Sequence, residues 1–209
     1  FPESFESGVP PTGWVKYRGT NNLGTAKDWE TTNVSNTGSY AAFVRYENVS
    51  GGIAEDWLVT PQFTPTSSTS MLTFMERQSY TTNYGSNYSI RISTSSQTTH
   101  GDFNIIESYD ETDFTYYYTS RVIDLSSYIG TPIYVAFVMS NDDGDNWIID
   151  DVSLSAPLIC QPPNNITLTN IGTNYAEVSF NNNGTPDNYN INLYEGIDNS
   201  GLEIIDLDN

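Results

Sequence analysis

Short runs rich in β-branched and aromatic residues recur between residues 40 and 154, and stretches rich in Gly, Pro, Asn and Ser separate them. Ile90 and Ile92 alternate with polar neighbours, which is typical of a strand with one face in a core and the other in water. The 3.6-residue period of an amphipathic helix is hard to find anywhere. The runs predict β-strands at 40–46, 57–60, 71–76, 87–93, 104–107, 115–123, 133–139 and 147–154.

This pattern favours an all-β protein in which two antiparallel sheets face each other. The run 133–139 is apolar almost throughout, so we expect a central strand there. The intervening loops carry the Gly, Pro, Asn and Ser residues that turns require, and loops of a sandwich commonly carry binding residues.

A stretch with three prolines, Ser155–Pro163, interrupts the strand pattern and predicts a linker at 157–163. Strand-like runs resume beyond it, at 165–169, 175–180 and 189–194. A seven-stranded sandwich needs about 100 residues, and about half of that remains. We therefore predict a first domain at 1–156 and an incomplete second β unit at 164–209.

The chain is strongly acidic, with 26 Asp and Glu against seven Lys and Arg and a formal net charge of −19. All seven basic residues lie at or before Arg121. Nucleic acids and anionic membranes are poor partners, because neutralising their phosphates needs clustered Lys and Arg. Repulsion among the acids also destabilises the compact state, and bound cations such as calcium would relieve it.

The start of the chain and its single cysteine bear on where the protein works. The sequence begins at Phe1 without a basic-then-apolar leader, and no apolar run approaches 20 residues, so we expect a processed or excised segment without a membrane span. Cys160 is the only cysteine, which excludes an internal disulfide and a Cys-x-x-Cys site. It is either a small buried side chain or the partner of a cysteine beyond residue 209.

Several short segments, taken in order, carry a resemblance to a known family. They are Phe5–Gly8 with Pro11–Trp14, Asp56–Pro61, Val122–Gly130, Ile133–Phe137 and Trp147–Leu154. Together they resemble the cleaved-adhesin and choice-of-anchor J modules of secreted Bacteroidetes proteins, which are relatives of the MAM-type jelly roll. The resemblance covers about residues 1–155. It implies an extracellular jelly-roll β-sandwich that binds calcium and serves in adhesion or as an accessory module, without catalysis.

The segment after residue 160 is similar to the opening strands of a fibronectin type III module. Cys160–Pro163 is followed by the strand-like runs Asn165–Thr169 and Ala176–Phe180. Phe180 stands where that family usually has a strand Trp, and its later strands are missing. The resemblance implies a partial fibronectin III-like β segment at 164–209.

Asp150 and Asp151 stand inside the apolar run Trp147–Leu154. Strict alternation would place Asp150 on one face with the aliphatic residues at 148, 152 and 154, where a carboxylate is costly unless it is paired or bound to a metal. Because no Lys or Arg follows Arg121, a cation is the simpler partner. The alternative is that these carboxylates cap turns or pair with Arg45 or Arg77.

The resemblance implies where such a calcium ion would sit. In calcium-binding jelly rolls the ion commonly joins the first and last strands, so Glu3 and Glu6 would meet Asp150 and Asp151. Asp56 belongs to a segment that carries the resemblance and is a further candidate ligand. A few carboxylates with loop carbonyls would provide the 6–8 oxygen atoms that calcium prefers.

The acidic stretch NDDGDN at 141–146 does not match an EF-hand loop, because aligning Gly144 at position 6 puts Met139 at position 1. Asp and Asn side chains hydrogen-bond to their own backbone and Gly permits a positive φ, so a polar turn is the favoured interpretation.

Catalysis has little support. His100 lies in a polar segment where we expect a solvated loop residue, and neither H-E-x-x-H nor G-x-S-x-G is present. The pair Glu55 and Asp56 could in principle serve a glycosidase, but 26 acids make such pairs common by chance. The aromatic run 114–119 should pack one side in the core and expose at least one tyrosine, either as a carbohydrate platform or as ordinary packing.

These observations predict a secreted or surface-displayed, non-catalytic adhesion module that calcium stabilises. Its loops would bind a glycan or a cell-surface protein. The alternatives are an accessory carbohydrate- or substrate-binding module of a secreted hydrolase and a structural repeat of a surface stalk or filament.

Overall fold

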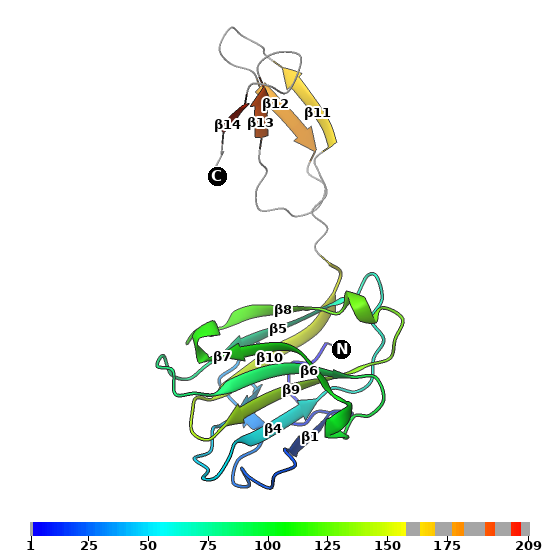
Figure 1. The fold of residues 1–209 in the computed structure, drawn as a ribbon. Helices are drawn as coiled ribbons and strands as arrows, with labels where there is room; N and C mark the ends of the chain where they lie inside the picture. Colours follow the sequence, from blue (N-terminus) through cyan, green and yellow to red (C-terminus); the bar gives the residue numbers. More distant parts are fainter. Residues whose placement is uncertain (1, 158–163, 170–176, 182–190, 195–201, 206–209) are drawn as a thin grey trace. The chain divides into compact units, whose positions relative to one another are not determined.

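The computed structural model describes residues 2–157, 164–169, 177–181, 191–194 and 202–205. In the first unit, residues 1–157, two antiparallel five-stranded sheets face each other (Figure 1). One sheet has the order β1 (Val15–Arg18), β4 (Ala54–Val59), β9 (Tyr134–Asn141), β6 (Asn87–Ser93), β7 (Asn104–Asp110). The other has the order β2 (Glu30–Thr32), β3 (Ala41–Val44), β10 (Trp147–Ser155), β5 (Met71–Arg77), β8 (Thr119–Asp124).

The helical elements of the described residues are three short 3₁₀ turns, at His100–Asp102, Glu111–Asp113 and Ser126–Tyr128. None of the described helices is long and apolar enough to cross a membrane. The first unit is therefore the all-β jelly-roll sandwich that the sequence predicted.

The main core lies between the two sheets, where alternate residues of the facing strands meet. Leu72 and Phe74 of β5 belong to it, and the Phe74 ring lies edge-on to the Phe137 ring of β9 at 5.0 Å. Trp147 of β10 is fully buried and contacts the Tyr88 ring at 5.2 Å and the Phe137 ring at 6.0 Å. Aromatic rings thus fill much of the space between the sheets.

The prediction of a central strand at 133–139 is confirmed by β9, which lies between β4 and β6. Its inner face carries Val135, Phe137 and Met139, and its outer face carries Ala136 and Val138. Trp57 of β4 packs with that outer face, so both sides of the strand are covered.

The eight strands predicted for the first unit are present, with shifts at their ends. β6 has the predicted bounds, whereas the strand predicted at 115–123 begins only at Thr119. The sequence analysis missed β1 and β2, which are short strands at the edges of their sheets. Their sequences, VKYR and ETT, carry too few apolar residues to show a pattern.

The prediction that Asp150 shares a face with Val152 and Leu154 is wrong. The register of β10 against β5 shifts between Asp150 and Ser153, and Asp151 has a φ of +50°, so the strand contains a β-bulge. Trp147 and Ile149 face the core before the bulge and Val152 faces it afterwards. Asp150 therefore lies on the opposite face from the core residues that precede it.

The second unit comprises residues 158–209. Its described strands form two hairpin-like pairs: β11 (Asn164–Thr169) with β12 (Glu177–Asn181), and β13 (Ile191–Tyr194) with β14 (Leu202–Ile205). The predicted linker, except Pro157, and Cys160 lie outside the described residues. The fibronectin III-like assignment stays a prediction.

Candidate functional site

The N-terminal segment lies beside β10, so the first and last parts of the first unit meet as the resemblance implies. Glu3 and Val152 form an antiparallel bridge in which each N–H donates to the other's carbonyl at 2.8 Å. The Glu3 carboxylate accepts the N–H of Phe5 at 2.6 Å. Because the Phe5 ring is fully buried, it anchors the segment that carries both Glu3 and Glu6.

Asp150 and Asp151 hold the loop that precedes β3. Asp150 is fully buried, and its Oδ2 accepts the N–H of Asn36 at 2.8 Å and of Thr37 at 3.2 Å. The side chains of Asn36 and Thr37 donate to Asp151 at 2.8 and 2.5 Å. Burial raises the pKa of Asp150, and these amide hydrogen bonds oppose the rise. Both carboxylates therefore have hydrogen-bond donors as partners.

Glu6 binds the same loop at positions a few residues further along it. Its Oε1 accepts the N–H of Ser39 at 2.8 Å and of Tyr40 at 2.9 Å. Gly38 has a φ of +64°, and a Cβ there would lie 2.2 Å from Glu6 Oε1. The close approach of loop and carboxylate thus depends on glycine at this position.

Three of the five predicted calcium ligands, Glu6, Asp150 and Asp151, bind this loop, and Glu3 is joined to β10 by its bridge with Val152. The hydrogen bonds found at their oxygens come from N–H and O–H donors. Among the described residues, no three His, Cys, Asp or Glu side chains are placed to hold a metal ion. Calcium at this position stays a prediction. The hydrogen bonds found agree with the alternative, in which these carboxylates cap the turns of a loop.

The proposed arginine partners are engaged elsewhere. The Arg45 guanidinium lies 5.3 Å from the centre of the Tyr46 ring, and that of Arg77 lies 4.4 Å from the Tyr116 ring. Neither forms an ion pair with Asp150 in the described part of the chain.

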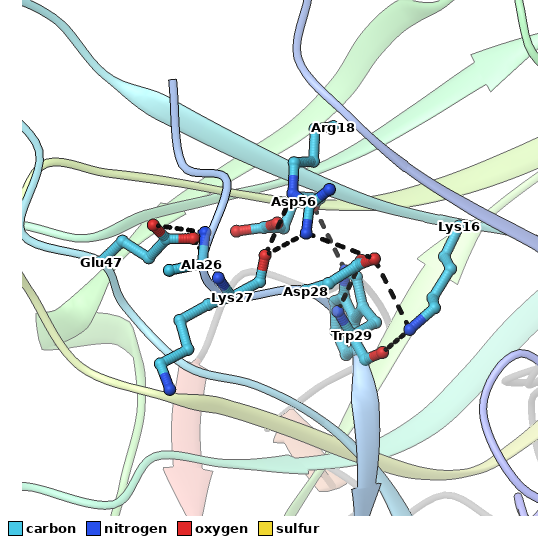
Figure 2. Close-up of polar contacts among 8 residues, drawn as sticks. All are labelled: Lys16, Arg18, Ala26, Lys27, Asp28, Trp29, Glu47 and Asp56. Atoms are coloured by element: carbon cyan, nitrogen blue, oxygen red, sulfur yellow. Dashed lines mark hydrogen bonds and ion pairs between the residues drawn. The ribbon is translucent and has the colours of Figure 1, made fainter. Parts of the chain in front are cut away.

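Asp56, the fifth predicted ligand, belongs to β4 of the other sheet. The charged groups that act on it are Asp28, Glu47, Arg18 and Lys16, and none of the other predicted ligands is among them (Figure 2). Burial, followed by the charges of Asp28 and Glu47, raises the pKa of Asp56 to about 8. The structure thus separates Asp56 from the carboxylates at β10.

A group of exposed tyrosines occupies two adjacent loops, and we call it the tyrosine surface: Tyr80 and Tyr84 on the 78–86 loop, with Tyr116 and Tyr117 on the 114–118 loop. The N–H of Gln78 donates to the Thr115 carbonyl at 3.0 Å, which joins the two loops. The Tyr80 and Tyr84 rings lie edge to face at 5.9 Å. Tyr117 is 76% exposed. The prediction that the run 114–119 exposes a tyrosine is confirmed.

Two buried carboxylates hold the 78–86 loop by accepting hydrogen bonds from its backbone. Asp145 accepts the N–H of Ser79 at 3.2 Å and of Tyr80 at 2.8 Å. Glu111 accepts the N–H of Ser86 at 2.7 Å and also that of Tyr84. Because backbone donors surround both carboxylates, the loop has a defined shape beneath its tyrosines.

The NDDGDN stretch forms the turn between β9 and β10, as its polar residues indicated. Gly144 has a φ of +143°, and a Cβ there would lie 1.9 Å from Ser86 Oγ. The turn therefore packs tightly against the base of the 78–86 loop. The sequence analysis did not foresee that Asp145 would support another loop.

The residues considered for catalysis are engaged structurally. The expectation of a solvated His100 is wrong, because its ring packs on Tyr17 at 4.9 Å and Trp57 at 5.0 Å, and its Nε2 lies 2.7 Å from the Arg18 carbonyl oxygen. Glu55 pairs with Arg91 at 2.8 Å. Glu55 and Asp56 are successive strand residues whose side chains point to opposite faces, so they do not face a common cleft.

No family model and no curated protein matches the chain. The K1 cleaved adhesin domain of Lys-gingipain from Porphyromonas gingivalis is 20% identical with a TM-score of 0.59, over 75% of this chain and 97% of that domain. The K3 domain of the same protein is 18% identical with a TM-score of 0.57, over 75% and 96%. A carbohydrate-binding module of the β-sandwich superfamily is 14% identical with a TM-score of 0.50, over 73% and 60%. The resemblance to cleaved-adhesin modules is thereby confirmed at the level of the fold.

Proposed function

We propose that this chain is a non-catalytic extracellular recognition module that binds a neutral glycan through the tyrosine surface. The observation that carries the proposal is the exposure of Tyr80, Tyr84, Tyr116 and Tyr117 on two hydrogen-bonded loops. Exposed aromatic rings gathered on a supported surface mark a binding site more often than scattered apolar residues do.

The chemistry of tyrosine matches that of a sugar. A pyranose ring has apolar C–H faces that pack on aromatic rings, and hydroxyl edges that need hydrogen-bond donors and acceptors. Tyrosine provides both, and it loses little conformational entropy on binding because only two side-chain torsions are fixed. The net charge of −19 repels sulfated or other acidic glycans, which favours a neutral ligand.

The fold relatives support binding rather than catalysis. Two are adhesin domains and one is a carbohydrate-binding module. The adhesin domains belong to a Bacteroidetes protein, which supports an extracellular setting. Glu55 and Asp56, the carboxylate pair considered for a glycosidase, point to opposite faces of β4 and do not flank a common cleft.

Calcium is part of the proposal as a stabilising ion, because the resemblance implies it and the acidic chain would gain from a bound cation. An ion that binds the folded chain and not the unfolded chain would raise the melting temperature by mass action. Its loss would weaken the framework beneath the loops without touching the tyrosines.

The function is tested by screening the full 209-residue chain against neutral polysaccharides, followed by titration with the best ligand. Tyr80→Ala with Tyr84→Ala, and Tyr116→Ala with Tyr117→Ala, should each weaken binding by about tenfold or more, which is about 1.4 kcal/mol. Tyr40→Ala removes a ring outside the surface that is about as exposed as that of Tyr80, and it should leave affinity unchanged. Equal affinity of all variants, or no neutral glycan bound at millimolar concentration, would refute the proposal.

A further inference from the structure

Arg77 is an arginine without an acidic partner in a strongly acidic chain. Of the five arginines, Arg18, Arg91 and Arg121 pair with carboxylates, and the chain offers 26 acids. Arg77 forms no ion pair among the described residues, and its Nε–H donates to the neighbouring Gln78 carbonyl at 3.1 Å. Its side chain is half-buried, and its two terminal nitrogens are within reach of solvent. They therefore have N–H groups to offer a ligand.

Aromatic rings hold the Arg77 guanidinium in place. Arg77 is the last residue of β5, and alternation places it on the opposite face from Phe74 of the core. There the guanidinium carbon lies 4.4 Å from the centre of the Tyr116 ring and 5.8 Å from that of the Tyr118 ring. The Tyr118 hydroxyl donates to the Val34 carbonyl at 2.7 Å, which fixes that ring in turn. A guanidinium that is already ordered loses little freedom when it binds a ligand.

The position of Arg77 is next to the tyrosine surface. Tyr116 belongs to that surface, and the residue after Arg77 is Gln78, whose N–H joins the two tyrosine loops through the Thr115 carbonyl. The exposed rings of the surface offer apolar faces on which a sugar can pack. Arg77 adds a charged hydrogen-bond donor at the edge of those faces.

The shape of a guanidinium limits what it can bind. Its planar fork donates two parallel hydrogen bonds to two oxygen atoms that lie close together. In a sugar, either a carboxylate or two hydroxyl groups on adjacent ring carbons provide such a pair. Burial, and then the negative charge of Asp150, raise the pKa of Tyr118, so the ring beside Arg77 lies in a negative field. This field and the net charge of −19 oppose a carboxylate and leave a hydroxyl pair unaffected.

We propose that Arg77 is the polar anchor of the tyrosine surface and donates from its two terminal nitrogens to two adjacent hydroxyl groups of a neutral pyranose. The C–H face of the same sugar packs on a tyrosine ring of the surface. The ligand class is therefore a neutral glycan with a free pair of neighbouring hydroxyl groups in the bound unit. This inference rests on the proposed function and names the hydroxyl pattern that the same site selects.

Arginine variants test the contact in the full chain, with the best neutral polysaccharide from the screen as the probe. Arg77→Met keeps the apolar stem and Arg77→Lys keeps the charge, and both remove the planar fork. Each should weaken binding by about tenfold or more, because hydrogen bonds from a charged donor are lost. Arg45→Met is the matched control and should leave the affinity unchanged. The Arg45 guanidinium also lies on a tyrosine ring, 5.3 Å from that of Tyr46, outside the tyrosine surface.

A second measurement separates sugar recognition from support of the loops. The probes are the methyl glycoside of the neutral sugar that the screen identifies and its monodeoxy analogues, each used as a competitor of the polysaccharide. The wild type should bind two analogues, which lack one or the other of two adjacent hydroxyl groups, several-fold more weakly than the parent glycoside. Arg77→Met should not distinguish these analogues from the parent, because the partner of both hydroxyl groups is gone.

The outcomes distinguish this inference from the proposed function. Unchanged affinity of Arg77→Met or Arg77→Lys, together with binding lost in the tyrosine variants, would overturn the inference and leave the proposed function standing. An Arg77→Met variant that still rejects both deoxy analogues would also overturn it. Tighter binding of polygalacturonate than of every neutral polysaccharide, lost in Arg77→Met, would overturn the hydroxyl pair in favour of a carboxylate. A wild type that binds no neutral glycan would overturn both proposals.

Discussion

Glu76 gives the first unit a pH-dependent stability that can be worked out from the structure. It is 1% exposed on β5, where its Oε2 accepts the Nε1 hydrogen of Trp147 at 3.1 Å and its Oε1 pairs with Arg121. Burial raises the pKa of Glu76 to about 7, while Arg121 and Trp147 restrain the rise and Asp113 adds to it. Between about pH 4.5 and pH 7, the folded state therefore keeps a proton on Glu76 that the unfolded chain has already released.

The direction and size of the change in unfolding free energy follow from the difference between the folded and unfolded pKa of Glu76. An unfolded Glu releases its proton near pH 4.5, so its stabilising contribution is complete below that pH and is lost as the pH rises to about 7. A difference of about 2.5 pKa units corresponds to about 3 kcal/mol of unfolding free energy. Glu76→Gln removes the titration and keeps the shape, so its stability should not show this loss.

The assay is urea unfolding of both proteins between about pH 4.5 and pH 8, followed by tryptophan fluorescence. All four tryptophans lie in the first unit, so the signal reports that unit. The unfolding free energy of the wild type minus that of Glu76→Gln should fall by about 3 kcal/mol across this range. Glu107→Gln, on the exposed face of β7, controls for the loss of one negative charge. Parallel profiles for the wild type and Glu76→Gln would refute the reasoning.

Three further predictions concern the loops and the core. Gly38→Ala should lower the unfolding free energy of the first unit by about 1 kcal/mol or more, because a Cβ at this positive φ would collide with Glu6. Unchanged unfolding free energy in chemical denaturation would show that the loop moves aside and would contradict this prediction. Phe74→Ala should cost about 3–5 kcal/mol in the same assay, since the ring is buried against Phe137, and a cost below 1 kcal/mol would contradict that packing. Asp145→Ala should weaken glycan binding several-fold by releasing the loop beneath the tyrosine surface, whereas unchanged affinity would mean that the loop does not depend on this carboxylate.

Much of the sandwich could be predicted because its central strands show their burial in the sequence. The apolar run 133–139 predicted β9, whose two faces are both covered. Edge strands receive neighbours on one side only, and β1 and β2 carry too few apolar residues to reveal a period. The bulge at Asp151 could not be foreseen either, because one inserted residue reverses the alternation that the prediction used.

The candidate sites depended on contacts between distant parts of the chain. The resemblance placed Glu3 and Glu6 beside β10, and the bridge between Glu3 and Val152 agrees with that. It could not indicate that loop N–H groups would satisfy Asp150, or that Asp56 would lie instead with Glu47. Such partners come from loops whose course sequence patterns do not describe.

The central claim, that the tyrosine surface binds a neutral glycan, is tested most directly by fluorine NMR. The full chain is labelled with fluorotyrosine, and resonances are assigned with single Tyr→Phe variants before the best glycan from the screen is added. The account predicts that signals from Tyr80, Tyr84, Tyr116 and Tyr117 shift on titration while that of Tyr88, buried in the core, stays unchanged. Shifts confined to tyrosines outside the tyrosine surface, or no shift at saturating glycan, would contradict it.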